Sequence, residues 1–300
     1  MTDTNTGFAE DCDSLLRFLF DNHKGVRGEI LHMHKPCTDL LSPHSYPECV
    51  KSLMLDLAVA SQLFCATLKD GSEVMLQIRG GKGSPLKYAI INTRHDSTFY
   101  GSASLDPALP CPDGLPFAKL AGDDGVLAIT IFPEGDAKDR WQGIVPLGTE
   151  SVAGALENYF KDSAQLPTRF FIKSDPKREA AGGIMLQVIP EVPGNLDSLE
   201  HLSVLASTIT AGELWKLSNI DILSRLFARE EVRILPSRPV AFRCICSKAR
   251  CEQALMSMDP RELESIAREQ DGATMSCQHC GRKYVFTKAE LEALLARSCQ

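Results

Sequence analysis

Two pairs of cysteines near the C-terminal end most constrain how this chain can fold. The pairs are Cys244-Ile245-Cys246 and, after the thirty residues 247–276, Cys277-Gln278-His279-Cys280. On an extended segment, side chains two residues apart lie on the same face, and a C-x-x-C bent into a turn also brings its sulfurs together. If the pairs meet, their four thiolates form a closed tetrahedral site, the usual arrangement for structural zinc. The spacing therefore predicts that Cys244, Cys246, Cys277 and Cys280 bind one Zn²⁺ per chain.

The overall charge argues against a nucleic-acid or membrane partner. The chain has 32 Lys and Arg against 39 Asp and Glu, so its net charge of −7 provides no attraction to nucleic acid or anionic lipid. No apolar run approaches the roughly 20 residues that span a bilayer, and residues 1–7 lack the basic and apolar regions of a secretory signal. Eleven cysteines without such a signal indicate reduced thiols and metal rather than a disulfide framework. We therefore expect a cytoplasmic protein.

Residues 1–190 have the pattern of an α+β domain. Residues 49–68 carry apolar side chains at helical spacing and predict a buried helix, and residues 151–160 predict another. Runs typical of strands are separated by Gly, Pro and Asp. These runs are 26–33, 73–79, 86–92, 98–105, 126–132, 140–145, 168–173 and 183–189. Because the strands cluster with few helices between them, we predict a mostly antiparallel sheet with packed helices.

A helical linker, residues 191–240, is predicted between this domain and the C-terminal module. Proline-rich stretches mark both its ends. Residues 196–227 predict short amphipathic helices, broken at Gly212 and Asn219. Short helices are marginal without tertiary packing, so we expect the linker to be metastable. Its apolar stripe consists of Leu199, Leu202, Trp215, Leu217, Ile222, Leu223 and Phe227.

Residues 241–300 form a small module around the four cysteines. Two helical stretches, 248–256 and 260–269, are predicted between the pairs, and a turn and a strand follow the second pair. Thr287 and Glu290 then have the spacing of a capping box, which begins a last helix. About 60 residues make a poor apolar core, so bound metal is expected to stabilise this module.

Further motifs extend over essentially the full length of the chain. In the module they are Val240-Ala-Phe-Arg-Cys244-Ile-Cys246-Ser-Lys-Ala-Arg250-Cys251 and Cys277-Gln-His-Cys280-Gly-Arg-Lys-Tyr284-Val-Phe286. Before it they are Phe20, Val26-Arg-Gly-Glu29, Trp141-Gln-Gly-Ile-Val145, Leu166-Pro-Thr-Arg169 and Ala180-Ala-Gly-Gly-Ile-Met-Leu-Gln-Val188. Together these motifs resemble one family, the redox-regulated holdase chaperones of the 33-kDa heat-shock protein class.

The resemblance implies a redox switch in a protein that is not an enzyme. In the reduced family, zinc holds the four cysteines as thiolates and the monomer is inactive. Oxidation joins Cys244 with Cys246 and Cys277 with Cys280, releases the metal and unfolds the module. The linker is then destabilised and uncovers apolar surface that holds unfolding client proteins without ATP, and the active protein forms homodimers. The predicted client-binding residues are those of the stripe: Leu199, Leu202, Trp215, Leu217, Ile222, Leu223 and Phe227.

The chemistry of the residues supports this interpretation independently. A four-thiolate site has no open coordination position, so catalytic zinc is not expected. Thiolates are the form of cysteine that peroxide or hypochlorous acid oxidises, and loss of metal removes the module's main stabilising interaction. An exposed apolar stripe in the linker would provide the surface that unfolded proteins need.

Two other functions are compatible with four clustered cysteines. The first is a structural zinc ribbon in a nucleic-acid-binding or regulatory protein. Residues 241–300 carry nine Lys and Arg against eight Asp and Glu, which is no phosphate-tracking surface. The second is a thiol–disulfide oxidoreductase that uses Cys277 and Cys280. That chemistry normally needs a thioredoxin-like βαβ unit, and the sequence lacks its pattern.

The remaining cysteines lie outside the two ligand pairs. Cys65 is expected on the buried face of its helix as a small apolar residue. Cys251 is expected to be a bystander, and Cys299 to be exposed and able to form adventitious disulfides. No role in the switch is predicted for Cys12, Cys37, Cys49 or Cys111.

Three patterns that suggest other sites have ordinary explanations. His32 and His34 share a strand face near Cys37, but surface histidines are commoner than a second metal site of this kind. Residues 80–84 lack the G-x-x-x-x-G-K-[ST] spacing of a phosphate loop and predict a glycine-rich hairpin turn. His279 is not needed as a ligand, because four cysteines complete the set.

Overall fold

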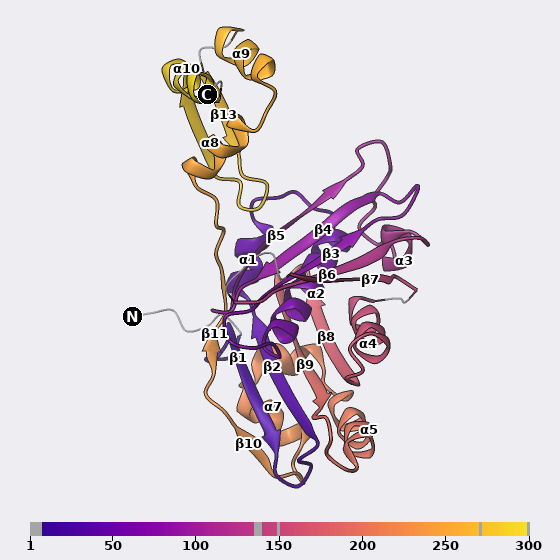
Figure 1. The fold of residues 1–300 in the computed structure, drawn as a ribbon. Coiled ribbons are helices and arrows are strands. Elements are labelled where there is room, and N and C mark those ends of the chain that lie inside the picture. The colour runs from indigo at the N-terminus through magenta and orange to yellow at the C-terminus, as the bar shows by residue number, and fades with distance from the viewer. Residues whose placement is uncertain (1–7, 135–139, 149–150, 270–271, 299–300) are drawn as a thin grey trace. The chain divides into compact units, whose positions relative to one another are not determined.

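The chain folds into two compact units, which meet in the sequence between Arg243 and Cys244 (Figure 1). The computed structural model describes residues 8–134, 140–148, 151–269 and 272–298. The first unit contains two six-stranded sheets, and the described part of the second contains a two-stranded sheet with three helices.

The first sheet of the larger unit is antiparallel throughout. Its strand order is β10-β1-β2-β9-β8, and β11 also pairs with β1. The strands are β1 (Ser14–Phe20), β2 (Val26–Met33), β8 (Thr168–Asp175), β9 (Ala180–Val188), β10 (Val232–Ile234) and β11 (Arg238–Pro239). Every residue of β9 is buried, because helices cover both faces of this sheet.

The second sheet has the order β12-β5-β4-β3-β6-β7, and only the short β12 pairs in parallel. Its strands are β3 (Glu73–Arg79), β4 (Leu86–Thr93), β5 (Thr98–Leu105), β6 (Val126–Phe132), β7 (Trp141–Pro146) and β12 (Ala241–Phe242). The predicted glycine-rich turn joins β3 to β4, and Gly83 has a φ of +76° there. That left-handed backbone favours glycine.

Helix α2 (Glu48–Cys65) packs against both sheets and forms the centre of the largest apolar core. Thirteen of its 18 residues are buried, as expected for a helix that is apolar on all sides. Beyond its C-terminal end, Arg17 donates to the Ala66 carbonyl and Arg27 to the Thr67 carbonyl. Helices α1 (Lys35–Leu41), α3 (Phe117–Ala121) and α4 (Val152–Asp162) complete this layer.

Three short helices cover the other face of the first sheet. They are α5 (Asn195–Ala206), α6 (Ala211–Lys216) and α7 (Asn219–Leu226). The sequence predicted breaks at Gly212 and Asn219, but both residues lie within helices. The breaks instead precede α6 and α7, where the hydroxyls of Thr210 and Ser218 accept hydrogen bonds from the first turn of each helix. Such caps satisfy N–H groups that the helix itself leaves unpaired.

The second unit is built on the hairpin of β13 (Gly272–Ser276) and β14 (Lys283–Thr287). Its helices are α8 (Lys248–Met256), α9 (Pro260–Glu269) and α10 (Lys288–Ser298). Among the described side chains, its buried apolar core consists of Leu255, Phe286, Leu291 and Leu294. The predicted capping box is confirmed: the Thr287 N–H donates to the Glu290 carboxylate at 2.9 Å, and the Glu290 N–H donates to the Thr287 hydroxyl at 3.4 Å.

The predicted α+β class, with mostly antiparallel sheets and a C-terminal four-cysteine module, is confirmed. The predicted strands at 73–79, 98–105 and 126–132 and the helices at 248–256 and 260–269 have these same bounds. Strands β1 and β13 and helix α1 are not apparent from the sequence pattern. No described helix combines the length and the apolar character needed to cross a bilayer. The division of the larger unit into a core, 1–190, and a metastable linker stays a prediction.

Gly28→Ala is expected to destabilise the first sheet. Gly28 lies opposite Phe18 across β1 and β2, and a Cβ atom at Gly28 would lie 2.1 Å from Cζ of this fully buried ring. Overpacking of this kind should lower the free energy of unfolding by about 1–3 kcal/mol, as measured by urea unfolding of the reduced protein. Gly114→Ala is the matched control, because a Cβ there meets nothing within 4 Å. Equal unfolding midpoints for the two variants would contradict the predicted clash.

Candidate metal centre

The two cysteine pairs lie in different local structures of the second unit. Cys244 and Cys246 lie on the segment between β12 and α8, and Cys277 and Cys280 lie in the turn between β13 and β14. Backbone hydrogen bonds of 2.9 Å, from Gly281 N to Cys277 O and from Cys277 N to the Arg282 carbonyl, close this turn. Gly281 has a φ of +67°, which a residue with a side chain rarely adopts.

The structure brings the four cysteine sulfurs together, all within 4.8 Å of one another. Between the pairs, the sulfurs are 3.5 Å apart from Cys244 to Cys277 and 3.4 Å apart from Cys246 to Cys280. Tetrahedral zinc with Zn–S bonds of ~2.3 Å places its sulfurs about 3.8 Å apart. All four cysteines are free and half-buried. Four soft sulfur donors at nearly this spacing fit Zn²⁺.

Tyr284, on β14, is the neighbour that most affects the chemistry of the sulfurs. Its hydroxyl donates a hydrogen bond of 3.1 Å to Sγ of Cys246. Desolvation acts to raise the pKa of the Cys246 thiol, but hydrogen bonds from Tyr284 and from the other thiols outweigh it, so this pKa lies below its ordinary value. The pKa of the Cys244 thiol is raised, chiefly by desolvation. Cys246 therefore carries thiolate character more readily than Cys244.

The helices beside the cluster are anchored by polar contacts. Ser247 caps α8, its hydroxyl accepting a hydrogen bond from the Arg250 N–H at 3.3 Å. The next residue, Lys248, forms an ion pair of 2.5 Å with Glu290 of α10, and its ammonium lies 5.2 Å from the ring centre of Phe286. These contacts connect the segment that carries the first cysteine pair to the small core.

The residues predicted to bind clients lie in the first unit, where α5, α6 and α7 pack on the first sheet. Six of the seven are at most 4% exposed, and Leu217 is partly buried. The six buried residues are Leu199, Leu202, Trp215, Ile222, Leu223 and Phe227. They are part of the apolar core in this structure, so client binding by them stays a prediction that requires their release.

Cysteines outside the cluster have varied surroundings. Cys65 lies on the buried face of α2, as predicted, and its desolvation raises the pKa of its thiol to about 12. Cys37 is fully buried on α1, and desolvation also raises the pKa of Cys12 to about 12. Cys251 packs at the edge of the small core of the second unit. Cys299 lies outside the described residues, so its predicted exposure is not tested.

Among the described residues His32 and His34 belong to no metal-binding cluster, but His32 is buried and not at the surface as expected. His32 is buried, with Nδ1 at 2.8 Å from the Leu214 carbonyl and Nε2 at 3.2 Å from Asp11, so both ring nitrogens have protein partners. His34 instead stacks on Phe8 with a ring-centre distance of 4.1 Å. The backbone N–H of His279 donates to Sγ of Cys277 at 3.4 Å, and the absence of its side chain from the ligand set stays a prediction.

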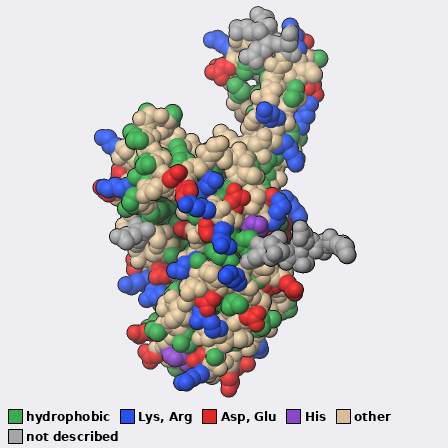
Figure 2. Space-filling view, turned by 180° about the vertical axis from the view of Figure 1, so that it is seen from behind, with side chains coloured by type: hydrophobic (Ala, Val, Ile, Leu, Met, Phe, Trp, Pro, Cys, Tyr) green, Lys and Arg blue, Asp and Glu red, His purple; other side chains and the backbone are tan. Residues whose placement is uncertain are grey.

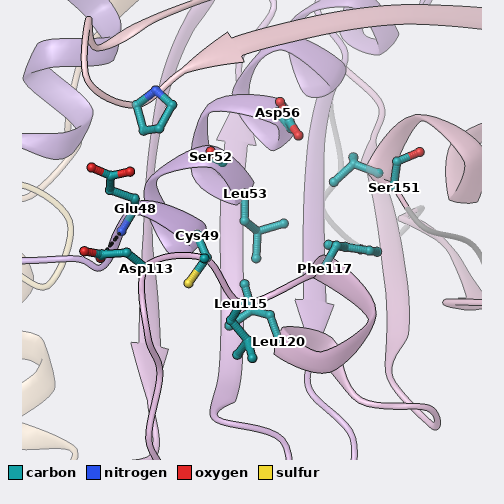
Figure 3. A pocket seen from close by; sticks show the side chains of 13 residues that line it. Glu48, Cys49, Ser52, Leu53, Asp56, Asp113, Leu115, Phe117, Leu120 and Ser151 are labelled. Atoms are coloured by element: carbon teal, nitrogen blue, oxygen red, sulfur yellow. Dashed lines mark hydrogen bonds between the residues drawn. The ribbon is translucent and has the colours of Figure 1, made fainter.

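A pocket of about 290 Å³ beside α2 was not anticipated from the sequence (Figure 3). Cys49 lies in its wall, and Sγ of this residue is 3.6 Å from Sγ of Cys111. Asp113 accepts a hydrogen bond of 2.8 Å from the Glu48 N–H at one end, and desolvation raises the pKa of the Asp56 carboxyl at the other to about 6. Cys49 and Cys111 are 62 residues apart in the chain, so only the fold brings these two cysteines together.

Comparison with known proteins gives one consistent result. The sequence profile of the family described as Hsp33 protein matches residues 13–287. The 33 kDa chaperonin of Edwardsiella ictaluri (strain 93-146) is 38% identical over 286 residues, which cover 95% of this chain and 95% of that protein. The 33 kDa chaperonin of Pectobacterium carotovorum subsp. carotovorum (strain PC1) is 38% identical over 286 residues, or 94% and 96% of the two chains.

A solved structure shares the fold. The crystal structure of the 33 kDa chaperonin (heat shock protein 33 homolog) from Thermotoga maritima matches with a TM-score of 0.81. The match covers 96% of this chain and 99% of that chain at 21% sequence identity. The common architecture therefore extends over both units.

Tyr284→Phe is expected to weaken zinc binding. The substitution removes the hydroxyl that donates to Cys246 and leaves the four sulfurs in place. Loss of such an outer partner should lower zinc affinity about tenfold, measured in the reduced protein by competition with a chromophoric chelator. Tyr46→Phe, which removes a hydroxyl from the first unit, should leave this affinity unchanged. Unchanged affinity in Tyr284→Phe would show that the hydrogen bond does not stabilise the thiolate.

Proposed function

This chain belongs to the Hsp33 family, and we propose that it is a redox-regulated molecular chaperone that holds unfolding proteins without ATP. The relatives at 38% identity are named chaperonins. The observation that carries the proposal is the convergence of four cysteine sulfurs within 4.8 Å. Four protein ligands leave no coordination position for a substrate, so the site is suited to a switch rather than to catalysis, and the proposal includes no enzymatic activity.

In the reduced state the chain is an inactive monomer. Cys244, Cys246, Cys277 and Cys280, whose sulfurs lie within 4.8 Å of one another, would hold one Zn²⁺ per chain. The bound ion keeps the four sulfurs as thiolates and cross-links the two cysteine pairs. Tyr284 favours the thiolate of Cys246 through its hydrogen bond. The cytoplasm suits this state, because thiols are kept reduced there.

Oxidation converts the four ligands into two disulfides, Cys244–Cys246 and Cys277–Cys280. For each disulfide, one thiolate attacks the oxidant, for example hydrogen peroxide, and becomes a sulfenic acid while the peroxide bond breaks. The thiolate of the partner cysteine then displaces hydroxide from the sulfenic acid as the sulfur–sulfur bond forms. Each pair loses two electrons to the peroxide, and two protons from solvent convert the two hydroxides into two water molecules. A disulfide sulfur is a poor zinc ligand, so the cross-link between the pairs is lost.

The second unit depends on this cross-link for its stability. Its buried apolar core, among the described side chains, has four members: Leu255, Phe286, Leu291 and Leu294. A unit of under 60 residues with so small a core is marginal by itself. Metal binding contributes ~10–16 kcal/mol to the folding of comparable zinc peptides. Loss of the thiolate ligands therefore unfolds the second unit.

The linker, 191–240, is connected to the first cysteine pair by short strands that separate easily. The backbone N–H of Arg243, next to Cys244, donates to the Phe99 carbonyl at 2.8 Å, and β12 forms two residue pairs with β5. Earlier in the chain than β12, β11 forms only two residue pairs with β1. When the segment after Arg243 unfolds, these pairings are the first to fray, and fraying proceeds toward α7.

Release of the linker helices uncovers the client-binding surface. The helices cover the first sheet with buried apolar residues, so undocking exposes both the helix stripe and the sheet face. Exposed apolar surface of this extent binds unfolded proteins and favours homodimers. The released residues include Leu199, Leu202, Trp215, Leu217, Ile222, Leu223 and Phe227. The three functional parts are thus a core, 1–190, the linker and a redox-switch module, 241–300.

The charge distribution gives no support to the alternative of a zinc ribbon that binds nucleic acid. On the face that Figure 2 shows, Lys and Arg are interspersed with Asp and Glu over both units. A phosphate-binding surface needs basic residues clustered on one face. The proposed partners are therefore unfolded proteins, without nucleic acid or membrane.

Peroxide treatment tests the proposal directly. At mildly denaturing temperature, the wild type should release about one zinc per chain as it begins to suppress the aggregation of citrate synthase, and reductant with zinc should reverse both changes. Cys251→Ser, outside the cluster, should behave like the wild type, whereas Cys277→Ser should lose zinc without oxidant. If zinc stays bound, or leaves without any gain in aggregation suppression, the site is only structural.

Gly212→Ala is expected to make activation harder. Gly212 lies in α6, and a Cβ there meets no atom within 4 Å, so alanine should stabilise this helix by about 0.5–1 kcal/mol. Zinc release after peroxide should be unchanged, but aggregation suppression should appear more slowly than in the Gly114→Ala control. Equal activation of both variants would show that linker unfolding does not limit the switch.

A further inference from the structure

Two histidines and a glutamate from three distant segments meet at the end of the first sheet. His23 lies in the turn between β1 and β2, His201 lies on α5, and Glu230 follows α7. Nε2 of His23 is 3.0 Å from one carboxylate oxygen of Glu230, and Nε2 of His201 is 2.9 Å from the other. The two imidazole ring centres lie 5.4 Å apart. One ligand atom from each residue lies within 4.8 Å of the others.

We propose that His23, His201 and Glu230 form a second metal site, which binds a divalent transition-metal ion such as Zn²⁺. Imidazole nitrogen and carboxylate oxygen are borderline donors that suit Zn²⁺, and they bind it at ~2.0–2.2 Å. The Glu230 side chain is only 7% exposed, whereas that of His201 is 50% exposed. The site is therefore anchored by a buried charge and open to solvent on one side, where water completes the coordination.

Outer partners hold the ligands in place. Ser198 Oγ lies 3.1 Å from Nδ1 of His23, so the other ring nitrogen, Nε2, is directed at the carboxylate. The Asn22 amide donates to Glu230 at 2.7 Å, and its carbonyl accepts from the Glu231 N–H at 3.1 Å. Metal-binding histidines commonly have such a partner on the second nitrogen, which fixes the tautomer and the ring orientation. This arrangement distinguishes the cluster from a chance meeting of surface charges.

An ion at this site would connect the linker to the sheet. Two of the ligands belong to the linker, and the third lies in the β1–β2 turn of the core. Undocking of α5 or of the segment after α7 must separate these ligands, so bound metal opposes release of the linker. The effect of this metal on linker release rests on the proposed function, whereas the existence of the site does not.

Zinc titration of the reduced chain tests the site. Isothermal titration calorimetry of protein whose four-cysteine site is already loaded should detect one further Zn²⁺ per chain. His201→Ala, at a half-exposed helix position, and Glu230→Gln should each weaken this second binding more than about tenfold, which exceeds the loss caused by removing an outer partner. His95→Ala, an exposed histidine outside the cluster, is the matched control and should retain it.

Hydrogen exchange of α5 provides a second measurement. When free zinc is at ten times the dissociation constant of the second site, amide exchange in α5 should slow about tenfold. This slowing is expected in the wild type and in His95→Ala, but not in His201→Ala or Glu230→Gln. Binding of a single zinc by the wild type, or a second zinc that His201→Ala and Glu230→Gln retain, would overturn the proposal. No client protein enters either measurement, so the absence of a second zinc alongside normal oxidative activation would refute this site alone.

Discussion

Coordination of one ion by four sulfurs is the interaction on which the proposed switch depends. The second unit buries four large apolar side chains among those described, which is too few for a unit of its length to be stable without a cross-link. The two cysteine pairs are close enough to supply that cross-link, at 3.4 and 3.5 Å between the nearest sulfurs. In the proposed switch the same atoms are the oxidation targets, so the stability of this unit would depend on its redox state.

The surroundings of each cysteine shift the pKa of its thiol, which bears on the proposed response to oxidant. Cys65 lies in an apolar environment that raises the pKa of its thiol to about 12, so very little thiolate is present at neutral pH. In the four-cysteine cluster, hydrogen bonds lower the pKa of the Cys246 thiol despite its partial desolvation. In the proposed switch, an oxidant that reacts with thiolates would therefore attack Cys246 in preference to Cys65.

The two helical layers around the first sheet differ in how they are held. Helix α2 packs between two sheets and cannot leave without loss of the main core. The linker helices contact one sheet face, and a few polar bonds fix them there. His32 bonds to the Leu214 carbonyl at 2.8 Å, and Asp11 accepts from the Asn219 N–H at 2.8 Å. A layer with one contact face is better suited to the proposed release than α2, which is enclosed by two sheets.

The sequence by itself determined the features that are encoded over short distances. Period-two and period-3.6 patterns predicted most strands and helices, and the C-x-C and C-x-x-C spacings identified all four cluster residues. The tertiary structure decided what depends on distant segments meeting. It placed the helix breaks at Thr210 and Ser218 and directed Tyr284 toward Cys246. It also brought together His23, His201 and Glu230, whose separations in the chain follow no motif. Local spacing controls which side chains share a face, but strand order and helix docking control which faces come into contact.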